Sequence, residues 1–184
     1  MESTYYGNLI RSVIDNSNSN VWENAVLEWD IDDCEEDEDL KSSCICGKEN
    51  LRYLYTIRNR INQNTLYPIG SSCIKKFARA DMKEETTVRE GMFKLLRAVK
   101  ENEYISLSAD LFSRKLLLAL YEARAFSNAY NQYDGENDYQ FLLKMFNKRD
   151  KDSITKRQRG KINAIILHSI KPYLMQQLAG KVKE

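Results

Sequence analysis

Two cysteines separated by a single residue, Cys44 and Cys46, are the sharpest chemical signal in the chain, and Gly47 follows them directly. A glycine tolerates the left-handed backbone of a tight turn, and such a turn can aim its amides at both sulfurs. Cys73 lies in the first turn of an expected helix, where the amide dipoles favour a thiolate. A knuckle joined through a β-hairpin to a cysteine at a helix start is typical of a structural zinc site.

Cys34 is the expected fourth ligand, which gives the spacing Cys34-x9-Cys44-x-Cys46-x26-Cys73. Four thiolates at about 2.3 Å would close a tetrahedron around zinc and leave no open position for catalysis. One alternative is that the four are buried free thiols, because cysteine is often buried as a small apolar side chain. A redox role for Cys44 and Cys46 is the other, although nothing nearby resembles a thioredoxin unit.

The elements that must position these cysteines are a hairpin and a helix. Residues 52–57 (RYLYTI) alternate and are rich in aromatic and β-branched side chains, as expected of a strand. Residues 59–64 read as a turn, and residues 66–69 (LYPI) as a second strand with Pro68 at an edge or end. A helix should start near Ser72. Upstream we expect a helix over 5–14 and a second one, capped by Asn20, that places Trp22 and Trp29 on one face.

From Asp81 onward the apolar spacing is helical. We expect a segment over 111–126 capped by Ser108, a helix over 139–146, and a last helix capped by Ser153 that ends before Pro172. The fold class is therefore α+β: a small zinc-stabilised β-hairpin module flanked by helices, followed by an α-helical bundle. The expected domains are 1–80 and 81–184, with the boundary between residues 78 and 84.

Charge is unevenly distributed, although the net charge is only +1. Between Asp30 and Asp39 there are eight acids and no base. This run is a solvated loop, a decoy for phosphates, or, least favoured, a metal-dependent carboxylate site, which would need better positioning than a flexible loop offers. The phosphate-mimic surface would consist of Glu35, Glu36, Asp37, Glu38 and Asp39.

Two basic clusters are candidate binding surfaces. The first follows the hairpin and the next helix, with tyrosines between the cations, a pattern that suits nucleic-acid backbones. The second lies at the start of the last helix, where cations and amides together could hold phosphates. In both cases the alternative is an ordinary solvated face. The residues are Arg52, Arg58, Arg60, Lys75, Lys76 and Arg79 in the first cluster, and Lys148, Arg149, Lys156, Arg157 and Arg159 in the second.

Composition excludes several classes of protein. With 42% hydrophobic and 30% charged residues the chain is globular, and the small net charge confines any nucleic-acid surface to a local patch. No apolar run approaches the roughly 18 residues of a membrane span, and the N-terminal residues do not read as a secretory signal. We find no P-loop, G-x-S-x-G or G-x-G-x-x-G motif, and the one histidine, His168, lies in an apolar helix. We therefore expect a binding protein rather than an enzyme.

Residues 44–77 resemble a small cysteine module in proteins of phages and other mobile elements of Gram-positive bacteria. The shared features are C-x-C-G, an aromatic strand ending in Asn, a hairpin, and (I/V)-G-S-x-C-I-x-x-F. Here they fall on Cys44, Cys46, Gly47, Tyr53, Tyr55, Ile57, Asn59, Ile69, Gly70, Ser71, Cys73, Ile74 and Phe77. The upstream tryptophans and Cys34 fit the same pattern, so the resemblance covers about residues 20–80. It implies a metal-stabilised binding module in a mobile-element setting.

The whole chain also resembles a type II-A anti-CRISPR family of Firmicutes, although no motif in the C-terminal half carries that likeness. The expectation is a non-enzymatic mobile-element protein that inhibits a type II CRISPR effector nuclease, by binding the nucleoprotein or by competing with its DNA. The alternative is a zinc-containing DNA-binding accessory or regulatory protein. A catalytic zinc protein is disfavoured by a closed four-sulfur site. Zinc is the expected cofactor, the bacterial host cytoplasm the expected location, no membrane is involved, and an exposed apolar stripe could form a homodimer.

Overall fold

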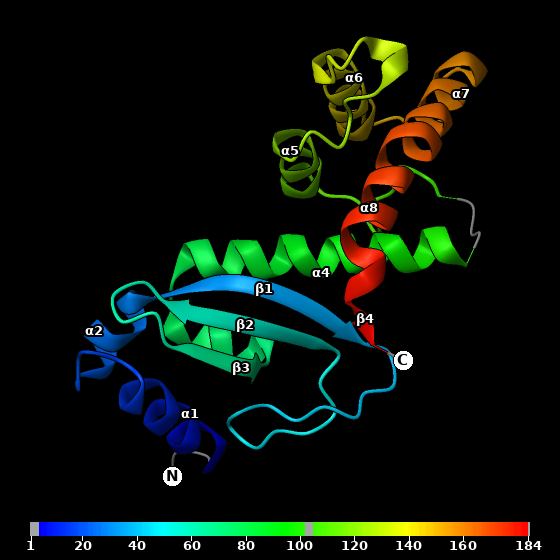
Figure 1. Ribbon diagram of the computed structural model, residues 1–184. Helices are drawn as coiled ribbons and strands as arrows, with labels where there is room; N and C mark the ends of the chain where they lie inside the picture. Colours follow the sequence, from blue (N-terminus) through cyan, green and yellow to red (C-terminus); the bar gives the residue numbers. More distant parts are fainter. Residues whose placement is uncertain (1–3, 102–104, 184) are drawn as a thin grey trace. The chain divides into compact units, whose positions relative to one another are not determined.

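The computed structural model describes residues 4–101 and 105–183, and its class is α+β, as the sequence predicts (Figure 1). The chain forms two compact units. The first runs from the N-terminus through Arg89 and takes in the residues from Lys181 onward, and the second covers Glu90–Gly180. The division falls inside helix α4 (Ala80–Lys100), beyond the expected 78–84. The expected domain 81–184 also differs at its end, because the C-terminal residues belong to the first unit.

A four-stranded sheet with the order β3-β2-β1-β4 forms the centre of the first unit. Strand β1 (Trp29–Asp37) is antiparallel to β2 (Tyr53–Asn59), and β2 is antiparallel to β3 (Thr65–Ile69), so the expected hairpin is present. Pro68 lies in the edge strand β3, where its missing amide interrupts no ladder. The short β4 (Val182–Lys183) adds a parallel strand beside the end of β1.

Residues 30–37 of the acidic run lie in β1, which corrects the expectation of a solvated loop, and Glu38 and Asp39 form a turn after it. The helix expected through Trp29 is wrong too, because α2 (Trp22–Ala25) and a 3-10 turn (Val26–Glu28) end before it and Val21 is the N-cap. Trp29 is fully buried and donates its indole N–H to Ser17 Oγ at 2.8 Å. The buried Glu28 carboxylate accepts hydrogen bonds from the amides of residues 18 and 19, which fixes the chain entering β1.

Besides α2, further helical segments belong to the first unit (Figure 1). Helix α1 (Thr4–Asp15) buries Leu9 and Val13, in agreement with the sequence prediction. Helix α3 (Ser71–Ile74) continues into a 3-10 turn (Lys75–Phe77). The first part of α4 covers one face of the sheet, where Tyr55 donates its hydroxyl hydrogen to the carbonyl of Thr86 at 3.2 Å.

The second unit is helical, as expected. After α4 it contains α5 (Arg114–Glu122), α6 (Glu136–Asn147), α7 (Lys156–Ile165), a π-helix (Ile166–Ile170) and α8 (Lys171–Leu178). The N-caps of α5 and α7 are Ser113 and Thr155, which corrects Ser108 and Ser153. Pro172 does not end the last helix, because it falls in the first turn of α8. Among the described residues, no helix is both long and apolar enough to cross a membrane.

Candidate metal centre

Three of the four cysteines converge in the first unit. Cys73 Sγ lies 3.6 Å from Cys44 Sγ and 3.4 Å from Cys46 Sγ, and all three sulfurs lie within 4.8 Å of one another. All three residues are buried. Zinc–sulfur bonds of about 2.3 Å in a tetrahedron place the sulfurs about 3.8 Å apart. The three thiols are therefore spaced almost as three corners of a zinc tetrahedron.

The knuckle that carries Cys44 and Cys46 is a tight turn that depends on glycine. Gly47 has φ +94°, a conformation that side-chain-bearing residues rarely adopt, and its amide donates to the Cys44 carbonyl at 2.7 Å. Two further hydrogen bonds anchor the knuckle: Ile45 N–H donates to the Pro68 carbonyl at 2.9 Å, and Asn8 Nδ2 donates to the Cys46 carbonyl at 3.1 Å. The turn is thereby held against β3 and α1.

A buried carboxylate directs the chain from β1 into the knuckle. Asp37 Oδ2 accepts hydrogen bonds from the Ser42 hydroxyl at 2.6 Å, the Ser42 amide at 2.9 Å and the Lys41 amide at 3.1 Å. The Ser42 hydroxyl, with these amides, holds the pKa of the Asp37 carboxyl below its ordinary value. Asp37 is therefore a structural anion, and a search for ligands in the sequence missed this role.

Cys73 reaches the cluster because Gly70 allows β3 to turn into α3 close to the knuckle. The Gly70 amide donates to Cys44 Sγ at 3.3 Å. A Cβ at this glycine would stand 2.9 Å from Leu51 Cδ2, so a side chain here would displace Leu51. The expectation that Cys73 lies in the first turn of a helix is confirmed.

Backbone amides are directed at two of the three sulfurs, those of Cys44 and Cys46. A hydrogen bond with the Cys73 thiol, together with the amides of Cys46 and Gly70, lowers the pKa of Cys44 to about 5 in the metal-free chain. Burial raises the pKa of Cys46, and the adjacent Cys44 raises the pKa of Cys73. Amides directed at sulfur stabilise the anion, and zinc binding requires deprotonated cysteines. The donor set therefore fits a thiophilic metal such as zinc.

Cys34 is not part of this cluster, which corrects the four-cysteine prediction within the residues that the structure describes. It lies in β1 directly opposite Tyr55 in β2, and opposed residues of an antiparallel pair point to the same face. Tyr55 contacts α4 through its hydroxyl, so Cys34 also faces α4. The sequence spacing could not reveal this, because the face of Cys34 depends on a register that contains a bulge between Ile31 and Asp33.

Most carboxylates of the acidic run are buried or paired with cations inside the fold. Glu36 is fully buried beside Arg52 and Asp37 is buried at the knuckle, which removes both from the expected phosphate-mimic surface. Glu35 Oε2 accepts from the Tyr67 hydroxyl at 2.6 Å and pairs with Lys183 at 2.7 Å. Only Glu38 and Asp39 of that surface are exposed.

Most residues of the first basic cluster are likewise engaged in ion pairs or hydrogen bonds within the fold. Arg52 pairs with Glu36 at 3.5 Å, Arg58 with Asp32 at 2.9 Å, and Arg79 with Asp30 at 3.0 Å. The Arg60 guanidinium donates to the Leu27 carbonyl, and Lys76 lies over the Tyr6 ring at 5.6 Å. Of these six residues, only Lys75 has no side-chain partner among the described residues. The strand of acids and the hairpin of bases neutralise each other.

Fewer residues of the second basic cluster have partners within the fold. Lys148 donates to the Ser153 carbonyl at 2.9 Å. Arg159 donates to the carbonyls of Ile154 and Lys151, both at 3.2 Å. Within residues 4–101 and 105–183, the side chains of Arg149, Lys156 and Arg157 have no partner, and all three are exposed. The first turn of α7 contains no acid, so its cations face the positive end of the helix uncompensated.

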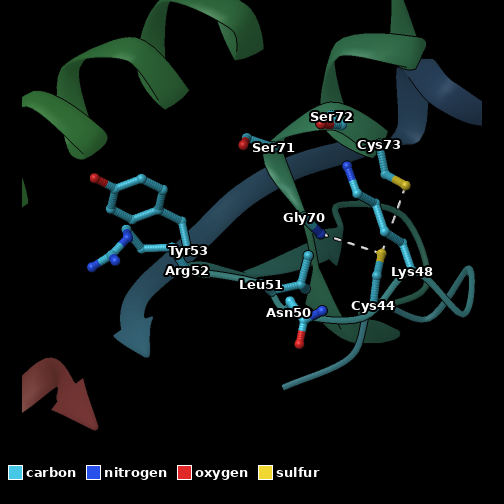
Figure 2. A pocket seen from close by; sticks show the side chains of 10 residues that line it. All are labelled: Cys44, Lys48, Asn50, Leu51, Arg52, Tyr53, Gly70, Ser71, Ser72 and Cys73. Atoms are coloured by element: carbon cyan, nitrogen blue, oxygen red, sulfur yellow. Dashed lines mark hydrogen bonds between the residues drawn. The ribbon is translucent and has the colours of Figure 1, made fainter. Parts of the chain in front are cut away.

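A pocket of about 180 Å³ opens beside the thiols, and Cys44 and Cys73 form part of its wall (Figure 2). Lys48, Arg52, Ser71 and Ser72 line the same pocket (Figure 2). The sequence gives no signal for this pocket, because its residues come from the knuckle, β2 and α3.

In comparisons with known proteins, no family model, curated protein or solved structure matches this chain.

Proposed function

We propose that Cys44, Cys46 and Cys73 hold one zinc ion that fixes the knuckle, the hairpin and α3 as a single module. Three buried sulfurs within 4.8 Å of one another, with backbone amides directed at those of Cys44 and Cys46, support this proposal. Thiolate ligands favour zinc over magnesium or calcium. A small sheet gains folding free energy directly from such a metal, because the unfolded chain holds no preformed site.

The protein that this module belongs to is proposed to bind nucleic acid, or a nucleoprotein, without catalysing a reaction. The observation that carries this proposal is the pair of exposed cations, Lys156 and Arg157, in the first turn of α7, where no acid accompanies them. The exposed Arg149 adds a third cation without a partner among the described residues, in the segment before α7. Like charges beside a positive helix end repel one another, and phosphates would relieve that repulsion. The paired acids of β1 make phosphate mimicry the weaker mode.

The specific target that we propose is a type II CRISPR effector nuclease in the cytoplasm of a bacterial host. The support for this target is the resemblance of residues 44–77, and of the chain as a whole, to proteins of mobile elements. The cations of α7 would contact nucleic acid within or entering the nuclease. Inhibition would then follow from competition for DNA.

The experiment is size-exclusion co-elution of the protein with a guide-loaded type II nuclease, beside a gel shift with free duplex DNA at several salt concentrations. Co-elution and inhibited cleavage support the proposed target. Binding to free duplex without nuclease binding supports the second candidate, a DNA-binding accessory protein, which the same cations favour. Binding to neither contradicts both functions.

A further inference from the structure

The three thiols leave a fourth position that no described residue fills. Among residues 4–101 and 105–183, the cluster of potential ligands that contains Cys44, Cys46 and Cys73 has no fourth member. Cys34 faces α4 and is not a member of the cluster. A structural zinc ion takes four donors, whereas a centre with three protein donors keeps one position for an external ligand.

The pocket gives this fourth position access from outside. Cys44 and Cys73 form part of its wall, and its volume of about 180 Å³ exceeds the roughly 30 Å³ of one water molecule (Figure 2). A donor atom that enters the pocket would approach the metal position from the side of Cys44 and Cys73. Cys46, which is 1% exposed, does not line the pocket. The cluster is therefore closed on one side and open on the other.

The pocket wall indicates which donor would be accepted. Zinc with three thiolates carries one net negative charge, so an anionic fourth ligand needs compensating cations. Lys48 is the cation of this wall that pairs with no described acid, whereas Arg52 pairs with Glu36, and the hydroxyls of Ser71 and Ser72 line the same space. None of the described residues around the pocket carries a carboxylate or an imidazole, so it offers neither a competing protein ligand nor the usual general base.

We propose that the metal centre is a three-cysteine site whose fourth position, facing the Lys48 pocket, takes an exchangeable small anionic donor from outside the chain. This inference rests on the proposed metal centre and goes beyond it, since a purely structural site would be closed. A partner could supply the donor as a carboxylate or thiolate side chain. Water would hold the position in the free protein.

The test uses the full chain loaded with cobalt(II), whose absorption reports both the number of thiolates and the fourth ligand. We expect the wild type and Cys34→Ser to show equal sulfur-to-cobalt charge-transfer intensity. Azide, the probe anion, should shift the ligand-field bands of both proteins saturably. Lys48→Gln should weaken azide binding about three- to tenfold, and Lys75→Gln, an exposed lysine without a partner, should not.

Two outcomes would overturn the open position and leave the metal centre standing. A spectrum that azide leaves unchanged means a closed site, and a loss of about a quarter of the charge-transfer intensity in Cys34→Ser means a fourth thiolate. Equal azide affinity in the wild type and Lys48→Gln would contradict the role of Lys48. Failure of the wild type to bind cobalt or zinc at all would instead contradict the proposed metal centre itself.

Discussion

The backbone amide of Gly70 donates a hydrogen bond to Cys44 Sγ at 3.3 Å, across 26 positions of sequence. This contact joins the end of β3 to the knuckle at the point where α3 begins. An amide directed at sulfur is worth most when the sulfur carries a charge. The fold therefore favours the Cys44 thiolate, and in the proposed metal centre the Gly70 amide would hold this ligand from outside the coordination sphere.

Gly47 should be indispensable to the knuckle. Because its φ is +94°, Gly47→Ala imposes backbone strain, and we expect a loss of about 1–2 kcal/mol in unfolding free energy with weaker zinc retention. Chemical denaturation with a chelator competition assay measures both. Gly160→Ala is the matched control, because it lies in α7 with open space around it and should be neutral or slightly stabilising. Equal stability of the two variants would contradict the assigned turn.

Asp37 should stabilise the protein only while it is ionised. Its pKa is lowered in the folded state, so its contribution is complete above the pKa of a free aspartate, about 3.9, and is lost as the pH falls through the lower folded value. We expect Asp37→Asn to cost roughly 2–4 kcal/mol at pH 7, because two amides and a hydroxyl lose their charged acceptor.

The pH dependence isolates the Asp37 contribution. Acid releases the metal from both proteins, so the difference in unfolding free energy between wild type and Asp37→Asn is the informative quantity. This difference should be constant from pH 7 to about 5 and shrink toward pH 3. A difference that is independent of pH would rule out the structural-anion role.

Charge reversal separates the exposed acids from the buried ones. Glu38 and Asp39 are exposed, so the pair Glu38→Lys and Asp39→Lys should leave stability and partner binding unchanged. Glu36→Lys should unfold the protein instead, because Glu36 is fully buried beside Arg52. Circular dichroism and the co-elution assay measure the two effects. Loss of nuclease inhibition in the folded Glu38/Asp39 variant would restore phosphate mimicry.

The exposed cations in the first turn of α7 and in the segment before it should determine the salt dependence of binding. Replacing Arg149, Lys156 and Arg157 by Gln removes up to three phosphate contacts, which should reduce the slope of log K against log salt by up to about 3. A matched triple variant at the exposed Lys41, Lys83 and Lys144 changes the net charge equally and should alter the slope far less. Equal effects of the two variants would mean that only net charge matters.

Local patterns in the sequence predicted the hairpin, the knuckle and most helices. Residues 52–69 show two short strand patterns with a turn between them. The C-x-C-G motif indicates a tight turn, because glycine can adopt a left-handed backbone conformation. The three clustered cysteines were identified from spacing because all three lie at the ends of these local elements. The α+β class follows from the same patterns.

Long-range pairing explains what the sequence did not reveal. The acids of residues 30–37 lie in a strand where cations neutralise them. These cations come from β2, from the residues just before β2 and α4, and from β4: Arg58, Arg52, Arg79 and Lys183. The spacing of the cysteines predicts Cys34 as a ligand wrongly, because it carries no information on which face of β1 this residue occupies. Two residues of β4 are too few to give any periodic signal.

Native mass spectrometry of the wild type, Cys34→Ser and Cys73→Ser, each before and after treatment with a chelator, tests the central claim most directly. We predict one zinc per chain in the wild type and in Cys34→Ser, and none in Cys73→Ser, with the melting temperature falling together with the metal. A wild type without zinc that melts normally would contradict the metal centre and return Cys44, Cys46 and Cys73 to buried free thiols.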